Sequence, residues 1–261
     1  MIRVRSDRSR WGWNCLGLLF LVPLLALVVQ AASARWFFPQ LLPEEWQPEL
    51  VLDLLERNEV RSAIESSASI AVVATLIALI VGLPAAWVLG TRNIPGRSAI
   101  VVLLIMPQLL PPLTASMGLS ISFLTAGVSG GFIPVVIAHV VQVLPFVVGI
   151  SALTFSRLDQ GYVAVGQGLG LPPSTLWRYV VWPMTRVGVL LAAYVGFVIS
   201  WSQYLITLFV GGGRVITLPM LVLSSGSGSN VSIFAALAFV MSVVPMALFL
   251  FAKKGPQGAT V

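Results

Sequence analysis

Charged residues are missing from five long stretches of the chain, which are 11–34, 66–91, 98–156, 187–213 and 215–252. A helix needs about 20 apolar residues to cross the hydrocarbon core of a bilayer. The stretches 11–34, 66–91 and 187–213 are long enough for one span each. The stretch 98–156 is long enough for two spans, separated by the glycine-rich 126–131. The last stretch holds one span, which follows the polar residues 224–230. The pattern therefore predicts six membrane spans, near 12–31, 66–89, 98–124, 132–155, 187–209 and 231–252.

Composition agrees with this pattern. Hydrophobic residues make up 57% of the 261 positions and charged residues only 9%, against about 25% charged in soluble domains. This excludes an ordinary soluble domain, and the high apolar content excludes a disordered chain. The single cysteine, Cys15, excludes a disulfide scaffold. The predicted class is an all-α integral membrane protein with six transmembrane helices.

The charged residues divide unevenly between the two sides of such a six-span protein. With a cytoplasmic N-terminus, the inner side carries eleven basic residues and two acids, whereas the outer side carries four arginines and seven acids. Cytoplasmic loops carry the excess of Lys and Arg, so both termini are predicted to be cytoplasmic. The net charge of +6 is spread over loops, which does not indicate nucleic-acid binding.

The N-terminal segment 1–62 is predicted to form a cytoplasmic tail, the first span and an outer amphipathic segment. A cleaved signal peptide is the alternative to the first span, but the apolar run Cys15–Ala32 is longer than the usual 7–15 residues of such a peptide. In the outer segment 34–62, leucines fall at helical spacing among acids and aromatic residues. This predicts a helix lying at the outer membrane surface, or a docking surface for an external partner. These leucines and aromatic residues are Leu50, Leu54, Leu55, Trp36, Phe37, Phe38 and Trp46.

The inner segment 156–186 is too long for a plain connection, and loops of this length are usually functional. Tyr162, Val165 and Leu169 share one helical face, Gly170 is placed to end that helix, and Ser174 to cap the next. We expect two short helices that meet at an angle and present a rigid knob to a soluble partner. The alternative is an interfacial helix pair without a partner.

Polar residues at membrane depth are expensive and usually face a bundle interior or an aqueous path. For His139, an interhelical hydrogen bond and a substrate contact are both open. Ser200, Gln203 and Thr207 are predicted to lie near one face of the fifth span, where they either line a path or pack. The whole set comprises Gln108, Thr114, Ser116, Ser120, Ser122, His139, Gln142, Ser200, Ser202, Gln203 and Thr207. No carboxylate occupies the middle of a predicted span, so a cage for a polyvalent cation is not expected.

The inner segment also resembles a known family. Ala164-Val-Gly-Gln-Gly-Leu-Gly170, followed after twelve residues by Pro183, is similar to the EAA loop of permease subunits of binding-protein-dependent ABC importers. Gly170 takes the position of the family's glycine, Trp177 that of its Phe, and Pro183 that of the proline leading into the fifth span. Ala164 stands where the family has Glu, Val165 and Gly166 where it has two alanines, and Trp182 where Leu is usual.

Three further stretches resemble the subgroup of polyamine, iron, thiamine and molybdate permeases. They are Pro107–Pro112 with Gly118, His139–Phe146, and Gly211–Pro219. The resemblance covers 63–253, leaving 254–261 as a cytoplasmic tail.

The resemblance implies a type I ABC importer permease fold in a bacterial-type inner membrane, with a coupling helix that docks on cytoplasmic ATPase subunits. It also implies partners, which are a second permease (a heterodimer favoured over a homodimer), two ATPases and an extracytoplasmic substrate-binding protein. The chain lacks a phosphate-binding loop with its Lys, so ATP and Mg are expected on the ATPases, and no catalytic residue, metal or cofactor on this chain. The residues expected to couple are Ala164, Gly166, Leu169, Gly170, Leu171, Pro172, Trp177 and Pro183. Those expected along the translocation path are His139, Gln142, Ser200, Gln203 and Thr207.

Two other classes work without an ATPase, namely a secondary transporter and an intramembrane enzyme. An enzyme needs an acid, base or nucleophile pair at membrane depth, and the only histidine, His139, has no acid within its span. A secondary transporter is expected to show an internal repeat and intramembrane ionisable groups. Apart from His139, neither is found, so the importer subunit is preferred.

Overall fold

The computed structural model describes residues 22–23, 25–36, 40, 42–128, 130–228 and 230–254. Contacts divide the chain into two compact units, 1–61 with 220–246 and 62–219 with 247–261. The predicted first span near 12–31 lies largely outside the described residues. In its described part, residues 25–31 are helical.

The first unit contains a short antiparallel pair of strands, β1 (Ser33–Arg35) and β2 (Glu45–Trp46), with Ser33 opposite Trp46. The prediction of one amphipathic helix over 34–62 is therefore wrong in its first half. Pro43 and Pro48 remove backbone donors there and prevent a helix. Phe37 and Phe38 lie outside the described residues. The second half is helical, in α2 (Leu50–Glu56), which buries Leu50 and Leu54 as their spacing predicted.

The C-terminal helices of the chain are α11 (Leu218–Gly226) and α12 (Val231–Lys254). The predicted sixth span, 231–252, matches α12. Its start is fixed by Asn230, whose Oδ1 accepts the backbone N–H groups of Ser232 (3.1 Å) and Ile233 (3.2 Å). Such a side-chain cap satisfies donors that the first helical turn leaves open.

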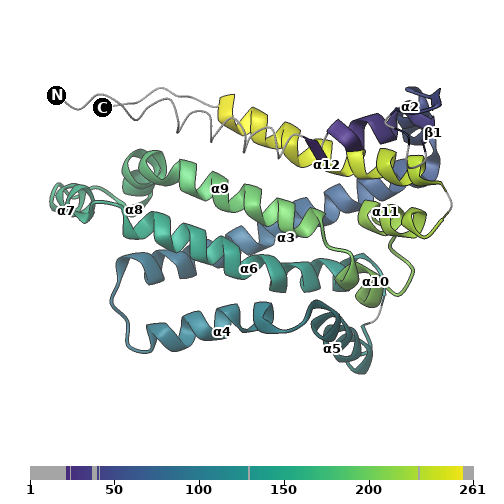
Figure 1. The fold of residues 1–261 in the computed structure, drawn as a ribbon. Helices are drawn as coiled ribbons and strands as arrows, with labels where there is room; N and C mark the ends of the chain where they lie inside the picture. Colours follow the sequence, from purple (N-terminus) through teal and green to yellow (C-terminus); the bar gives the residue numbers. More distant parts are fainter. Residues whose placement is uncertain are drawn as a thin grey trace, which may run out of the picture. The chain divides into compact units, whose positions relative to one another are not determined.

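Three long helices form the body of the second unit, α3 (Asn58–Thr91), α6 (Phe132–Ser156) and α9 (Trp182–Trp201). They lie side by side in Figure 1, where α6 and α9 run next to each other in opposite directions. Glycines allow this approach, because a Cβ on Gly196 of α9 would come within 2.9 Å of the Val143 side chain of α6, and one on Gly82 of α3 within 3.1 Å of Val148. Small residues at helix contacts are typical of membrane bundles.

The predicted third span, 98–124, is not one continuous helix. It forms α4 (Arg97–Leu109) and α5 (Pro112–Thr125), which are bent by 100°. Leu110 and Pro111 are extended (ψ 140° and 134°), and Pro112 begins α5. The two prolines supply no backbone donor and restrict the residue before each of them, which stops α4 at this point.

The fifth predicted span, 187–209, is displaced. A continuous helix runs from Pro173 to Trp201 through α8 (Pro173–Leu176), a π-helical turn η1 (Trp177–Val181) and α9. After a break at 202–204, the short α10 (Leu205–Gly211) follows. The second short helix expected in 156–186 is thus the beginning of the fifth span.

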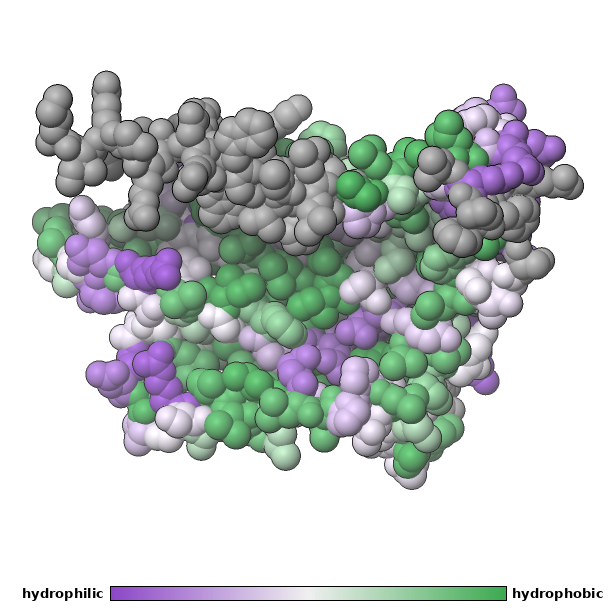
Figure 2. Space-filling view, in the orientation of Figure 1, coloured by the Kyte–Doolittle hydropathy of each residue, from purple (hydrophilic) through white to green (hydrophobic). Residues whose placement is uncertain are grey.

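Within the described residues, four helices are long and apolar enough to cross a membrane, or five if α4 and α5 count as one broken span. Figure 2 shows where apolar side chains lie on this face, since they cover much of α4 and the region between α6 and α9. Hydrophilic side chains gather at the end of this unit that carries α7 (Gln160–Gly168). The six-span prediction is therefore supported for only part of its helices.

Candidate functional site

Helix α7 presents an exposed apolar face beyond the ends of α6 and α9 (Figure 1). Tyr162, Val165 and Leu169 are 60%, 64% and 75% exposed. We call these three residues the α7 face. The flanking segments carry charges, with Arg157 and Asp159 before α7 and Arg178 after it. An apolar face rimmed by polar residues is typical of a protein interaction site.

The ends of α7 are fixed by local hydrogen bonds. At its start, the Asp159 carboxylate accepts the Gly161 N–H at 2.8 Å. At its end, Gly170 has φ +72°, its N–H donates to the Gln167 carbonyl (2.9 Å), and the Leu171 N–H donates to the Gly166 carbonyl (3.1 Å). This is a Schellman motif, which requires a left-handed residue that glycine provides most easily. The predicted stop at Gly170 is confirmed.

A close contact joins α7 to α8. Gly166 is buried, and a Cβ there would overlap the Leu176 side chain, itself buried. The predicted cap by Ser174 is wrong, because α8 begins at Pro173 after Pro172 with no side-chain cap. Proline is favoured at this first position because its fixed φ suits the helix and its missing N–H would have no partner there.

Trp177 anchors this corner to the long helices. Its ring lies 5.7 Å from that of Trp87 in α3 and 6.1 Å from that of Phe155 in α6, and the rings of Trp87 and Phe155 are 5.3 Å apart. Sequence reasoning singled out Trp177 but not Trp87 or Phe155, since nothing in their spacing marks them. A cavity of about 490 Å³ adjoins the cluster between α3, α7 and α8.

The other residues expected to couple lie around this corner. Ala164, Leu171 and Pro172 are exposed, and Pro183 is the second residue of α9 and also exposed. The structure thus brings Gly166, Gly170, Leu171, Pro172 and Trp177 together at one turn, whereas Ala164 lies on the side of α7 away from the α7 face.

His139 joins the two helices on either side of the break at 202–204. Its Nδ1 lies 2.8 Å from Ser200 Oγ in α9, and its Nε2 lies 3.0 Å from Thr207 Oγ1 in α10. Thr207 also donates to the Gln203 carbonyl (3.3 Å). With the Thr207 proton used in this way, we assign the ring proton to Nε2, which donates to Thr207, while Nδ1 accepts from Ser200.

The expectation that Ser200, Gln203 and Thr207 share one face of one helix is wrong, because the helix ends between them. Ser200 and Thr207 converge on His139 instead, and Gln203 lies half-buried in the break. All three members of the network are buried. The arrangement matches the interhelical hydrogen bond that was one of two interpretations for His139.

A second polar link joins α4 to α6. The Gln108 amide donates to the backbone carbonyl (2.9 Å) and the side-chain oxygen (2.8 Å) of Gln142. Ser116 and Ser122 bond to carbonyls of their own helix, and Ser202, in the break, bonds to the Ile199 carbonyl of α9. Ser120 bonds to the Phe209 carbonyl of α10 (2.9 Å), and Thr114 is exposed. Among the described residues, no group of three His, Cys, Asp or Glu is placed to hold a metal ion.

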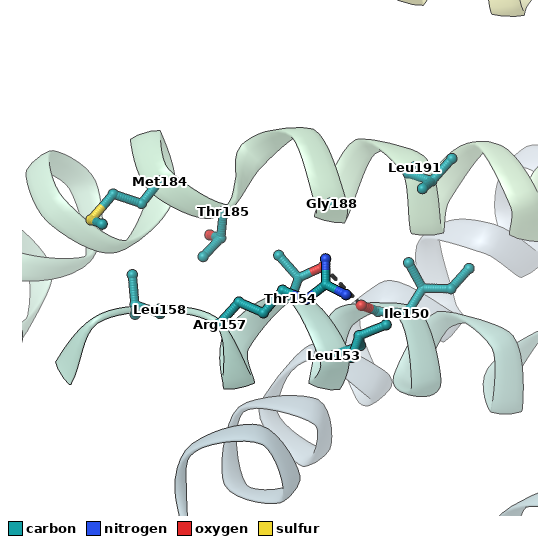
Figure 3. Close-up of a pocket in the computed structure, with 9 residues that line it drawn as sticks. All are labelled: Ile150, Leu153, Thr154, Arg157, Leu158, Met184, Thr185, Gly188 and Leu191. Carbon is teal, nitrogen blue, oxygen red and sulfur yellow. Dashed lines mark hydrogen bonds between the residues drawn. The ribbon is translucent and has the colours of Figure 1, made fainter. Parts of the chain in front are cut away.

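Figure 3 shows a groove between α6 and α9 that sequence reasoning missed. It encloses about 360 Å³ and is lined mainly by apolar side chains, with Arg157 at the end of α6. A pattern read along the chain could not show it, because its walls come from two helices.

Comparison with known proteins gives consistent results. Residues 79–253 match the family described as the binding-protein-dependent transport system inner membrane component. The chain is 30% identical over 201 residues to the inner membrane ABC transporter permease protein YnjC of Escherichia coli, covering 77% of this chain but only 38% of YnjC. It is 28% identical to the spermidine/putrescine permease PotC of Haemophilus influenzae, over 77% of this chain and 78% of PotC.

Solved structures share the fold at low sequence identity. A bacterial ABC transporter for the acidic polysaccharide alginate aligns with a TM-score of 0.71 at 12% identity, covering 97% of this chain and 99% of that one. The MetNI methionine transporter, in inward-facing conformations, aligns at 0.62 and 15% identity over 75% and 94% of the two chains. The described helices and the matched family agree with a multi-pass inner-membrane protein that transports rather than catalyses. The chain belongs to the binding-protein-dependent transport system inner membrane component family and is a transmembrane permease subunit of an ABC importer.

Proposed function

We propose that cytoplasmic ATPase subunits drive this permease by docking on the α7 face. The observation that carries the proposal is the exposure of Tyr162, Val165 and Leu169 on a helix whose two ends are fixed by hydrogen bonds. A rigid apolar knob can transmit a displacement, whereas a flexible loop would absorb it. The resemblance of 164–183 to the EAA loop supports the same role.

Motion enters the membrane through the continuous helix from Pro173 to Trp201. Gly166 packs α7 on Leu176, and the rings of Trp177, Trp87 and Phe155 fix that corner to α3 and α6. A displacement of α7 therefore moves α8 and α9 with it, and the His139 network lies at the far end of α9. Two arrangements of this element would correspond to inward-open and outward-open states, biased by ATP on one side and the loaded binding protein on the other.

The proposed assembly has a second permease, two ATPases that carry ATP and Mg, and an extracytoplasmic binding protein. We favour a heterodimer of permeases, and a homodimer is the alternative. The α7 end is cytoplasmic in this proposal, since 92–186 holds five arginines and one acid, as expected for inner loops. Both termini then lie inside.

The candidate path residues are His139, Gln142, Ser200, Gln203 and Thr207. The names of PotC and its relatives refer to spermidine and putrescine, which are polycations. This chain has no Asp or Glu in 66–158 or after Asp159. If the substrate is a polyamine, the acids that recognise it lie in 44–65 of this chain or on other subunits. The ligand retained by the purified binding protein identifies the substrate.

Cysteine cross-linking tests the docking surface. In a Cys15→Ser background the chain has no cysteine, so Leu169→Cys and Gln160→Cys place single thiols on opposite sides of α7. A short cross-linker should join the Leu169→Cys variant to the ATPase and leave the Gln160→Cys variant unlinked. Equal yields at the two positions would contradict docking on the α7 face.

A further inference from the structure

The groove between α6 and α9 combines apolar walls with one cation. Ile150, Leu153 and Leu191 line its sides, and Arg157 reaches back from the end of α6 along it (Figure 3). Where α9 passes closest, Gly188 contacts Thr154, and a Cβ at 188 would overlap that side chain. The groove is therefore a shallow channel with a closed floor.

The hydroxyl groups in the groove are already satisfied. Thr154 donates to the Ile150 carbonyl at 2.8 Å, and Thr185 to the Val181 carbonyl at 2.7 Å. Among the described residues, the Arg157 guanidinium has no hydrogen-bond or ion-pair partner, and the nearby Asp159 carboxylate accepts the Gly161 N–H. The groove thus offers apolar contact along its length, and the unpaired positive charge of Arg157 reaches back along it toward Thr154.

The combination of apolar walls and one cation suits a position at the membrane boundary, where hydrocarbon meets the lipid headgroups. Arg157 directly follows Ser156, the last residue of α6, so with the α7 end on the cytoplasmic side this residue belongs at the membrane boundary. A second groove of about 250 Å³, on the other flank of α6, has the same composition, with apolar walls, a shared Leu153 and Arg97 at its end. Basic pockets between membrane helices on the cytoplasmic side are typical sites for anionic lipid headgroups.

We propose that an anionic phospholipid occupies the groove between α6 and α9, with its phosphate on Arg157 and an acyl chain against Ile150, Leu153 and Leu191. The placement of this phosphate at the membrane boundary rests on the proposed cytoplasmic location of the α7 end. The lipid bridges the two helices beside the Thr154–Gly188 contact, where α9 moves in the proposed transport cycle. Zwitterionic lipids fit the apolar walls equally well but gain less from the guanidinium.

Lipid retention in the purified importer complex tests the proposal. The complex is exchanged into vesicles of phosphatidylglycerol and phosphatidylcholine in equal parts, extracted, and weighed intact by native mass spectrometry. We expect retained phosphatidylglycerol to exceed phosphatidylcholine, and Arg157→Gln to lower that excess about five-fold. Arg157→Lys should keep most of it because it keeps the charge, and Arg92→Gln, which removes an arginine that lines neither groove, should leave it unchanged.

A variant that blocks the groove tests the contribution of its apolar walls separately from that of the Arg157 charge. Leu191→Trp fills the channel while leaving Arg157 in place, and we expect it to lower retention of both lipids. Equal loss in the Arg157→Gln and Arg92→Gln complexes would overturn the proposal, because it would show a general surface charge effect. Retention unaffected by both Arg157→Gln and Leu191→Trp would also overturn it and would indicate that a partner subunit covers the groove. None of these readouts depends on whether the ATPase docks on the α7 face.

Discussion

His139 Nδ1 lies 2.8 Å from Ser200 Oγ, across the interface of α6 and α9. The same ring reaches Thr207 on the other side of the break at 202–204, at 3.0 Å from its second nitrogen. One side chain therefore holds the end of α9 and the beginning of α10 against α6.

Removing the His139 ring should destabilise the protein by about 1–3 kcal/mol, because two buried hydroxyl groups lose their partner. Ser200→Ala and Thr207→Ala should each have a smaller effect. The measurement is the midpoint of thermal unfolding in detergent. Ser202→Ala is the control, since that exposed hydroxyl donates to the Ile199 carbonyl, three residues before it, and does not contact His139. A shift for His139→Ala no larger than for Ser202→Ala would show that the network does not hold the break.

Alanine substitutions at two glycines separate the effect of helix packing on stability from that of helix propensity. A Cβ added at Gly149 would meet no other atom within 4 Å, whereas Gly188 faces Thr154 directly. Gly149→Ala should be neutral or slightly stabilising, since alanine is the better helix former. Gly188→Ala should lower stability by roughly 1–3 kcal/mol through overpacking. Unfolding of the two variants in parallel checks this, and similar midpoints would contradict the packing of α6 and α9.

Gln108 should control how firmly α4 is held. Helix α4 has no fully buried residue, and Gln108 provides its polar link to Gln142 in α6. Gln108→Leu should increase hydrogen exchange of 97–109 and leave exchange in α9 unchanged. Ser122→Ala, which removes a bond within α5 only, is the matched control. Unchanged exchange in α4 would show that apolar contacts alone hold that helix.

Trp177 should matter for coupling more than for docking, because its ring contacts α3 and α6 and is not part of the α7 face. We expect Trp177→Ala to keep the ATPase bound but to lower the substrate transported per ATP hydrolysed. Trp177→Phe should retain most coupling, since an aromatic ring remains. The ratio is measured in vesicles, and a Trp177→Ala complex with a normal ratio would contradict this role.

Mutation of the α7 face should separate insertion from assembly. Leu169→Asp places a charge on an exposed apolar surface and should leave membrane insertion intact while abolishing co-purification of the ATPase. Gly170→Pro should do the same, because it removes the N–H that the Gln167 carbonyl accepts. Gln160→Asp adds the same charge on the opposite side and should have no effect. Undiminished co-purification of the first two variants would exclude docking through α7.

The sequence predicted the features that depend on local patterns. Charge-free stretches located α3, α6 and α12, and Gly170 located the end of α7 because a Schellman turn needs a left-handed residue. The exposed apolar face of α7 followed from its helical spacing. Pro111 and Pro112 mark the bend between α4 and α5, but the sequence leaves open whether they kink the span, because prolines are also tolerated inside membrane helices, as Pro84 and Pro145 are here.

Other features depend on contacts between distant residues and could not be predicted. The break at 202–204 contains neither Gly nor Pro, and His139, more than 60 positions away, stabilises both of its sides. The helix that contains α9 begins earlier than predicted, because α8 continues through a π-helical turn into α9. The charges of Arg178 and Arg186 had placed these residues outside a membrane span. Snorkelling arginine side chains can accompany a helix near a membrane boundary.

Uptake in reconstituted vesicles tests the central claim most directly. Vesicles that contain this chain, its permease partner and the ATPases, together with the loaded binding protein, should accumulate substrate only when ATP is supplied on the cytoplasmic side. Vesicles with this chain alone should accumulate none. Substrate uptake by the chain alone, without ATPase subunits, would contradict its assignment as an ATP-driven importer subunit.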